Sequence, residues 1–470
     1  MIVRPLLALL AALALVLTAP GVPARGHGGG MGGGGGDHGG PPDGMGPGAA
    51  AGSGHGTGAE DRGPPDGARA RGEPGIGPPS PAATGRGSMR GAAMPARTGV
   101  GPGAGSENDR FGPALLASGL DADALEAALA LGFRLRSRER LAALDLQLVT
   151  LEPPLGVDPE RAARMLTARF PGVVVDFDHA YAPQGTASLE TCDDCWPRRL
   201  VAWPPAPRCR ASGPLALLDG APRVDHPALA GARLTVHRLA DAPATEHATA
   251  LALLLVGRGI GLVPEAALHA VAVYRSTPWG PRAGVRDLVR GLDLALRHRV
   301  RVALMPLAGP PNRLLALALR RARARGLLAV AAAGNGGPYA PPAHPAALPE
   351  TVAVTAVDRR LAPWPAAGRG PHLDFAAPGV ALPLSGADGR PFRASGTSFA
   401  TPFVAAALAL GPAAGFPRPD ALLAELARQA VDLGAPGRDP VFGHGLVRPP
   451  GPCRRSPATA PPVASSTAAP

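Results

Sequence analysis

The most informative stretch of the sequence is Ser395-Gly396-Thr397-Ser398-Phe399-Ala400-Thr401-Pro402. The apolar residues that follow it predict a helix over 398–410, so Ser398 stands at a helix start. The dipole of a helix favours negative charge near its N-terminus. The segment therefore predicts a hydroxyl placed where developing negative charge is stabilised.

Three further segments place polar residues at the ends of predicted elements: Leu217-Leu218-Asp219-Gly220, His247-Ala248-Thr249 and Ala332-Ala333-Gly334-Asn335. The first ends an apolar strand, the second opens an apolar helix and the third follows another strand. Taken alone, each has an ordinary structural explanation, because strand-end aspartates, capping histidines and turn asparagines are common. Their presence in one chain with Ser398 favours a shared site.

From Pro214 onward the predicted strands and helices alternate. Strands are expected at 215–218, 268–274, 300–304, 327–332 and 351–357, and helices at 247–256, 285–296, 312–325, 398–410 and 419–433. Continuous apolar strands between helices indicate an α/β fold with a parallel sheet covered on both faces. Catalytic side chains in such folds gather at the carboxyl ends of the strands.

A smaller pattern precedes this region. Helices are expected at 121–131 and 158–170, and strands at 133–136, 146–151 and 173–177. The second helix has an aspartate cap, Asp158, and a proline at its first position, Pro159. These elements predict a small α+β domain over 111–186.

The combined motifs resemble those of the subtilisin-like serine proteases. That family has an Asp after an apolar strand, a His at a helix start, an Ala-Ala-Gly-Asn turn and a Gly-Thr-Ser-x-Ala-x-Pro segment, in this order. Weaker matches occur at Val354–Asp358, Phe375–Gly379 and Gly443–Val447. The resemblance covers about 214–449 and implies a subtilisin-like parallel sheet with helices on both faces.

The resemblance also implies roles for individual residues. Asp219, His247 and Ser398 would form the catalytic triad, and the Asn335 amide would belong to the oxyanion hole. Asp225, which lies beyond the strand, is the alternative acid. The implied activity is that of a secreted serine endopeptidase, which hydrolyses peptide bonds through an acyl-enzyme and is made as a zymogen.

Substrate would bind as an extended strand between two edges. By resemblance, one edge comprises Leu304, Pro306, Leu307, Ala308 and Gly309, and the other is the segment after Tyr274. The family usually has Ser-Leu-Gly-Gly where this chain has Pro306 to Gly309. Proline removes a backbone donor and Ala308 adds a Cβ, which predicts narrowed or altered specificity.

The α+β domain resembles a protease propeptide, so the chain's own propeptide is expected to act as an intramolecular inhibitor. The segment 182–191 would then carry the processing site. The expected organisation is a signal peptide at 1–24, a disordered Gly/Pro-rich linker at 25–110, the propeptide-like domain at 111–186, the catalytic domain at 187–450 and a disordered tail at 451–470.

Export is predicted from the N-terminus, where Arg4 precedes the apolar run 6–17 and small residues end at Ala24. That run is shorter than the roughly 20 residues that span a membrane. The expected location is therefore extracellular, periplasmic or at the cell envelope. Export also favours disulfides among Cys192, Cys195, Cys209 and Cys453, which allow three pairings.

The charge and the metal-binding residue types indicate no further partner class. The net charge of +11 comes from scattered arginines without interleaved aromatics, so a protein or peptide substrate is expected and nucleic acid is not. Histidines and methionines in 25–108 would suit a weak copper or nickel site, although the composition favours a linker. Relatives often bind structural calcium, but no loop here is specific enough to assign one.

Two other functions remain open at this stage. One is a degenerate, non-catalytic subtilase-fold protein of the cell envelope that binds peptides. The other is a different serine hydrolase such as an esterase. The esterase is disfavoured because the G-x-S-x-G elbow is absent around Ser398, where the sequence is Gly396-Thr397-Ser398-Phe399-Ala400.

Overall fold

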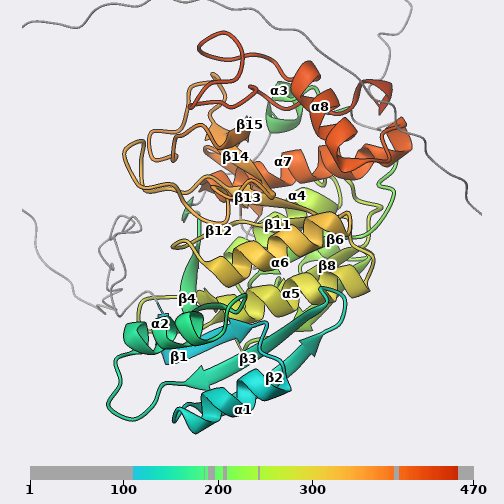
Figure 1. Cartoon of the computed structure of the whole chain (residues 1–470). Helices are drawn as coiled ribbons and strands as arrows, with labels where there is room; N and C mark the ends of the chain where they lie inside the picture. The colour runs from blue at the N-terminus through green and yellow to red at the C-terminus, as the bar shows by residue number, and fades with distance from the viewer. Residues whose placement is uncertain are drawn as a thin grey trace, which may run out of the picture. The chain divides into compact units, whose positions relative to one another are not determined.

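A computed structural model of the chain describes residues 110–184, 186–188, 196–204, 209–241, 244–385 and 391–453 (Figure 1). The predicted signal peptide and Gly/Pro-rich linker lie outside the described residues, as do Cys192, Cys195 and residues 454–470. Of the predicted processing segment, residues 185 and 189–191 also lie outside them.

The first described unit is an α+β unit. Its elements are β1 (Arg110–Ser118), α1 (Ala122–Ala130), β2 (Arg134–Leu141), β3 (Leu146–Glu152), α2 (Pro159–Arg169) and β4 (Val174–Pro183). The strands form an antiparallel sheet in the order β2-β3-β1-β4, and α1 and α2 pack on one face through Leu125 and Leu166. Asp158 accepts a hydrogen bond from the Arg161 N–H at 3.0 Å and so caps α2.

The second unit contains a parallel sheet in the order β15-β14-β13-β11-β6-β8-β7. Its strands are β6 (Leu215–Asp219), β7 (Leu234–Arg238), β8 (Leu268–Ala272), β11 (Val302–Met305), β13 (Leu328–Ala332), β14 (Thr351–Val357) and β15 (Leu373–Pro378). Apart from the edge strand β7, these strands are mostly apolar because helices bury both faces of the sheet. The predicted α/β fold class, with a parallel sheet covered by helices on both faces, is confirmed.

Two pairs of helices cover this sheet. They are α4 (Glu246–Val256) and α7 (Thr397–Leu410) on one face, and α5 (Val285–Arg297) and α6 (Arg313–Ala324) on the other. Successive side chains of β6 point to opposite faces of the sheet. Leu217 therefore packs toward α4 and α7, while Leu218 packs toward α5 and α6. The remaining α-helices are α3 (Trp196–Leu200) and α8 (Pro419–Gln429). Their side chains Leu200, Leu422 and Leu426 pack at the edge of the core between the sheet and helices α4 and α7.

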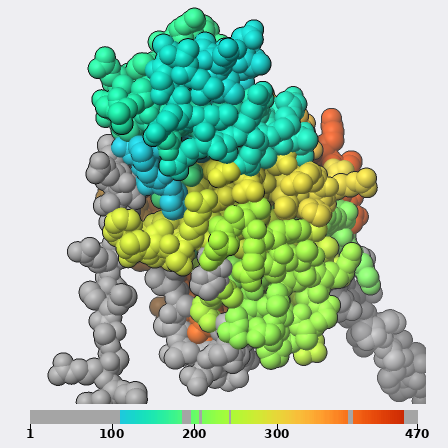
Figure 2. All heavy atoms as spheres, turned by 90° about the horizontal axis from the view of Figure 1, so that it is seen from below, coloured from blue at the N-terminus to red at the C-terminus, as the bar shows by residue number. Residues whose placement is uncertain are grey.

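Helices α5 and α6 lie between two sheets. Their outer faces pack against β1 and β3 of the α+β unit, where Leu116 and Leu148 join Leu288 and Leu292 of α5 in one buried cluster. Figure 1 shows this layering, and Figure 2 shows the blue-to-green unit seated directly on the yellow segment that contains α5. The α+β unit is therefore docked through an apolar core that both units share.

A disulfide joins Cys209 to Cys453 across 244 residues of sequence. It ties the segment before β6 to a short 3₁₀ turn, Gly451–Cys453, in which Cys453 is fully buried. The described residues thus include this turn, which lies just past the predicted domain end at 450 and is held by the covalent link. Within the described residues, no helix is both long enough and apolar enough to cross a membrane.

Candidate active site

The structure brings Asp219 and His247 into contact. Asp219 is the last residue of β6 and is fully buried, and His247 is the second residue of α4. The Thr245 hydroxyl caps α4 by accepting a hydrogen bond from the Ala248 N–H at 3.1 Å. The His247 Nδ1 lies 2.9 Å from Oδ2 and 3.1 Å from Oδ1 of Asp219. A carboxylate only accepts, so His247 carries its proton on Nδ1 and leaves Nε2 as a base.

Asp225, the alternative acid, is placed elsewhere. It pairs with Arg223 at 2.9 Å, and its side chain is 66% exposed. The Arg223 guanidinium lowers the pKa of Asp225, as expected for an exposed ion pair. Asp219 is thus the acid that meets His247.

Ser398 is the second residue of α7 and is fully buried. Gly396, just before the helix, has φ +153°, a conformation that favours glycine, and this accounts for the glycine of the motif. The Ser398 N–H donates to the carbonyl oxygen of Gln184 at 3.2 Å. Its Oγ donates to the Pro306 carbonyl at 2.8 Å, whereas Nε2 of His247 is buried without a hydrogen-bond partner. The hydroxyl is therefore turned toward Pro306 rather than toward the imidazole.

Asn335 follows β13, as predicted, and its amide is oriented by Thr397. Its Oδ1 accepts hydrogen bonds from the Thr397 N–H at 3.2 Å and from the Thr397 hydroxyl at 2.8 Å. These bonds point the NH2 group away from Thr397. The backbone N–H of Asn335 donates to Oε1 of Gln184 at 3.0 Å. Gln184 therefore contacts the backbone N–H groups of both Ser398 and Asn335.

The end of β4 occupies the predicted substrate groove. Antiparallel pairing joins Ala180 and Tyr181 to β10 (Arg282–Gly284), and joins Ala182 and Pro183 to β12 (Leu307–Ala308). Strand β10 in turn pairs with β9 (Tyr274–Arg275). After Gln184 and Gly185 the chain continues as β5 (Thr186–Ser188) alongside β17 (Pro391–Ser395), which pairs with β16 (Leu382–Ser385). One extended segment thus crosses the site between two edges.

Four of the five residues predicted for the substrate-binding edge lie beside the segment 181–184. Leu307 and Ala308 pair with β4, the Pro306 carbonyl accepts from the Gln184 N–H at 3.3 Å, and Gly309 packs against Tyr181. The fifth predicted residue, Leu304, is placed elsewhere. Leu304 lies inside β11, which has β13 and β6 as neighbours, so its backbone is already paired on both sides.

Tyr181 anchors the segment. Its side chain is fully buried, and its hydroxyl donates to the Pro310 carbonyl at 2.7 Å. A Cβ added to Gly309 would lie 2.6 Å from Cδ1 of the Tyr181 ring, so the pocket requires glycine at this position. The sequence carries no signal for this pairing, because the two residues are 128 positions apart.

Two carboxylates of β4 cap the helices on which the α+β unit rests. Asp178 accepts from the Arg286 N–H at the start of α5 (3.0 Å), and Asp176 accepts from the Arg313 N–H at the start of α6 (2.8 Å). Helix N-termini favour such acceptors. Burial raises the pKa of Asp178 to about 6, and the nearby Asp287 carboxylate contributes to the increase.

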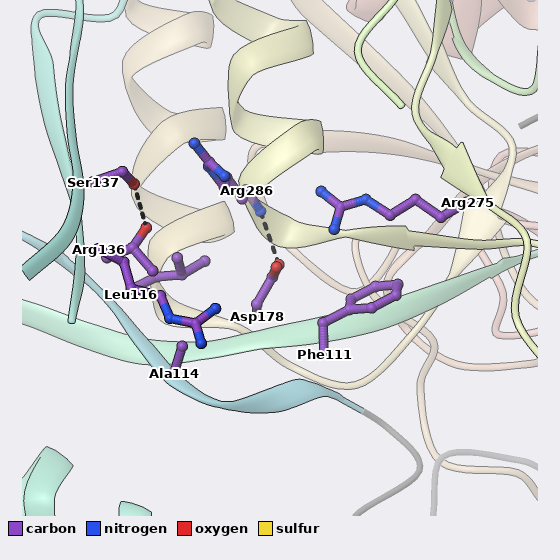
Figure 3. A pocket seen from close by; sticks show the side chains of 9 residues that line it. Phe111, Ala114, Leu116, Arg136, Ser137, Asp178, Arg275 and Arg286 are labelled. Carbon is purple, nitrogen blue, oxygen red and sulfur yellow. Dashed lines mark hydrogen bonds between the residues drawn. The ribbon is translucent and has the colours of Figure 1, made fainter. Parts of the chain in front are cut away.

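A cavity of about 400 Å³ lies beside Asp178, at the boundary between the two units. Figure 3 shows Asp178 bonded to Arg286, with Phe111 and Arg275 nearby. The guanidinium of Arg275 lies 5.3 Å from the centroid of the Phe111 ring and pairs with Asp287. Arg286 pairs with Glu139. The cavity therefore belongs to the docking interface and not to the triad.

Tyr274 was not predicted as part of the site. Burial, followed by the negative charge of Asp219, raises the pKa of the Tyr274 phenol, which keeps it protonated beside that carboxylate.

No carboxylate cluster suited to calcium occurs among the described residues. Their one set of three His, Cys, Asp or Glu side chains spaced for a metal consists of histidines.

The chain is similar to known proteases over a range that holds most of these residues. The model of the Subtilase family matches residues 236–445, a range that includes His247, Asn335 and Ser398. Minor extracellular protease Epr of Bacillus subtilis (strain 168) is 33% identical over 198 residues, which are 41% of this chain and 30% of Epr. Subtilisin of Bacillus pumilus is 34% identical over 155 residues, which are 32% of this chain and 55% of that protein. The chain thus spans between 30% and 55% of these two relatives.

Solved structures are also similar. Fervidolysin from Fervidobacterium pennivorans, described as a keratinolytic enzyme related to subtilisin, gives a TM-score of 0.62 at 18% identity, over 77% of this chain and 64% of that one. The epidermin leader peptide processing serine protease from Staphylococcus aureus gives 0.56 at 15% identity, over 72% and 97%. These likenesses concern the fold. Residues 236–445 thus match the Subtilase family, and the solved structures share the fold of the described chain.

Proposed function

We propose that the protein is a serine endopeptidase made as a zymogen, with Asp219, His247 and Ser398 as its triad. We further propose that the α+β unit is its propeptide and that the first bond it hydrolyses is Gln184–Gly185. One observation carries this proposal. The Gln184 carbonyl oxygen accepts a hydrogen bond from the Ser398 N–H, on a segment paired with edge strands before and after it.

The chemistry follows from the positions of these groups. A rotation about the Ser398 Cα–Cβ bond exchanges the Pro306 carbonyl for His247 Nε2 as the hydroxyl's acceptor. Nε2 then takes the proton while Oγ attacks the Gln184 carbonyl carbon. The resulting oxyanion is held by the Ser398 N–H and the Asn335 NH2 group, and Asp219 stabilises the imidazolium.

Breakdown of this intermediate completes the cleavage. The imidazolium gives its proton to the Gly185 nitrogen, which leaves as an amine, and Gln184 remains as an ester on Oγ. Water then adds to the ester with His247 again as the base, which releases the Gln184 carboxylate and restores the hydroxyl.

The same contacts support a preference among substrates. The buried pocket that holds Tyr181, three residues before Gln184, suits a large aromatic side chain, and Gly309 leaves room for its ring. The proposed substrates are extended protein or peptide segments with an aromatic residue at this position. The name of the relative Epr and the disulfide support secretion or a cell-envelope location.

A second candidate is a peptide-binding protein of the same fold without catalysis. It is favoured by the Ser398 hydroxyl bond to Pro306 and by the unpartnered His247 Nε2. The two candidates differ in whether the imidazole ever receives the serine proton.

The test is the mature N-terminus and mass of purified wild-type protein compared with Ser398→Ala. We expect the wild type to begin at Gly185 and to react with a fluorophosphonate probe, and the variant to remain uncut and unlabelled. Uncut, unlabelled wild type would reject the protease in favour of the binding protein. Labelled wild type cut at another bond would reject only the assignment of Gln184.

A further inference from the structure

A cluster of three histidines lies on the sheet away from the triad. His237 belongs to β7, the edge strand, and His269 belongs to the adjacent β8. The register pairs Thr235 with His269, so His237, two residues further on, points to the same face of the sheet as His269. His298 follows the last residue of α5, a helix that packs on this face.

The ligand atoms of this cluster are close together. One nitrogen from each imidazole lies within 4.8 Å of the other two. His237 Nε2 and His269 Nδ1 are 3.0 Å apart, and the His269 and His298 rings stack with their centroids 4.4 Å apart. In a tetrahedral zinc site with Zn–N bonds of 2.0–2.1 Å, two ligand nitrogens are about 3.3 Å apart. The spacing of the His237 and His269 nitrogens is close to this value. These two nitrogens now face each other in a hydrogen bond, and the His269 and His298 rings are stacked, so metal binding requires the rings to turn until their lone pairs converge on one point.

We propose that His237, His269 and His298 bind one first-row transition-metal ion, such as Zn²⁺, with water as its remaining ligand. Three imidazoles suit such ions and do not suit calcium or magnesium, which prefer oxygen. His298 is exposed, so the ion can enter from solvent and keep a water molecule.

A neutral imidazole offers the lone pair that coordination needs. Arg297, next to His298 in the sequence, is paired with Asp293 at 3.1 Å, which reduces its repulsion of a cation bound at the cluster.

The site would act on the fold and not on the catalytic chemistry. His269 stands three residues before Ala272, the partner of Asp219 in β6, and so lies roughly 10 Å from that pairing along the strand. A bound ion would link the edge strand β7 to β8 and to the end of α5. Because the three side chains meet only in the folded chain, binding would stabilise the native state.

The experiment uses the untagged full chain with Ser398→Ala, freed of metal by a chelator. We expect it to bind Zn²⁺ in competition with a chromogenic zinc indicator. We also expect its Tm to rise by roughly 5–10 °C at 100 times the Kd, and no rise with Ca²⁺. His298→Ala, a change at an exposed position, should weaken Zn²⁺ binding at least tenfold and remove the rise in Tm.

The matched control replaces His27, His38 and His55 with Gln, which removes histidines of the N-terminal segment and leaves the cluster intact. This control should keep both the affinity and the Tm shift. In the same control chain, Co²⁺ should give the intense visible absorption of a tetrahedral site, a readout that does not depend on any change in the cluster. An unchanged affinity in His298→Ala, or octahedral Co²⁺ bands, would overturn the proposal.

Discussion

At the scale of single residues, the site depends on a few hydrogen bonds that fix orientation. Asp219 sets the tautomer of His247, and Thr397 sets the direction of the Asn335 amide. Ser398 and Asn335 both hold Gln184 through their backbone N–H groups. The proposed catalytic roles follow from these orientations and not from proximity alone.

Replacing Asn335 tests the oxyanion hole. Asn335→Asp keeps an oxygen for Thr397 but replaces the NH2 donor with a negative charge. Self-cleavage of refolded chain should slow by at least 100-fold, since loss of one such donor cost about 100- to 1,000-fold in subtilisin, where it was measured. The rate is followed as loss of full-length chain on a gel. A change of less than tenfold would place the oxyanion elsewhere.

The raised pKa of Asp178, which lies where the two units dock, predicts that the stability of the folded chain depends on pH. Because burial raises its pKa to about 6 in the folded chain, the protonated form is the one the folded state favours. Protonation of Asp178 therefore stabilises the folded chain. This contribution is fully present below about pH 4 and is lost as the pH rises through 6, which increases the equilibrium constant for unfolding by up to about 100-fold. Arg275, Arg286 and Asp287 are the charged groups that act on it.

The comparison is made between Ser398→Ala chains with and without Asp178→Asn, which keeps an oxygen for the Arg286 N–H. Urea midpoints measured between pH 4 and 7.5 should diverge, because only the aspartate chain loses this contribution. Parallel curves would show that Asp178 does not titrate in this range.

Much of the site could be predicted at this scale, and the reason is local. Asp219, His247, Asn335 and Ser398 each stand at an element end marked by a change from apolar to polar sequence. Tyr181, Gln184 and Tyr274 gave no such signal. Their importance comes from contacts with residues far away in sequence, which no local pattern encodes.

At the scale of elements, β4 links the α+β unit to the second unit. It pairs with β1 in its own unit, then with β10 and β12 of the second unit, and two of its carboxylates cap α5 and α6. One strand thus joins the core of the small unit to the proposed active site.

Tyr181→Ala should release this strand. Truncating a large buried aromatic side chain costs about 3–5 kcal/mol, so in the Ser398→Ala chain the groove should open and digestion by an added protease near Gln184 should become faster. Tyr181→Phe is the control. It retains the ring and loses only the bond to the Pro310 carbonyl, at a cost of about 1 kcal/mol. Equal digestion of the two variants would contradict the anchoring role.

Prediction of elements succeeded where apolar periodicity was strong. The helices at 121–131, 247–256 and 398–410 and the strand at 351–357 match the structure to within a residue or two. Strand β1 was missed because Gly112 and Pro113 interrupt it, and β2 was predicted too short because its later residues are charged. Strand β4 extends six residues past its predicted end, because that part pairs with edges of the second unit.

At the scale of the whole molecule, two units share one core around α5 and α6. The parallel fold was predictable from alternating elements, but docking was not, since it depends on surfaces that face each other only after both units form. The disulfide pairing is another such case. Sequence allowed three pairings, and the closure of Cys209 with Cys453 depends on the segment before β6 meeting the turn Gly451–Cys453.

The segment that crosses the groove is covalently continuous with the groove itself, and this determines the kinetic order of the proposed first cut. A chain that already holds its own Gln184 against Ser398 needs no encounter with a second copy. Conversion should therefore be unimolecular, with a half-life that stays constant when the concentration of refolding protein is varied a hundredfold. A half-life that shortens as the solution is concentrated would mean that each molecule is cut by its neighbour.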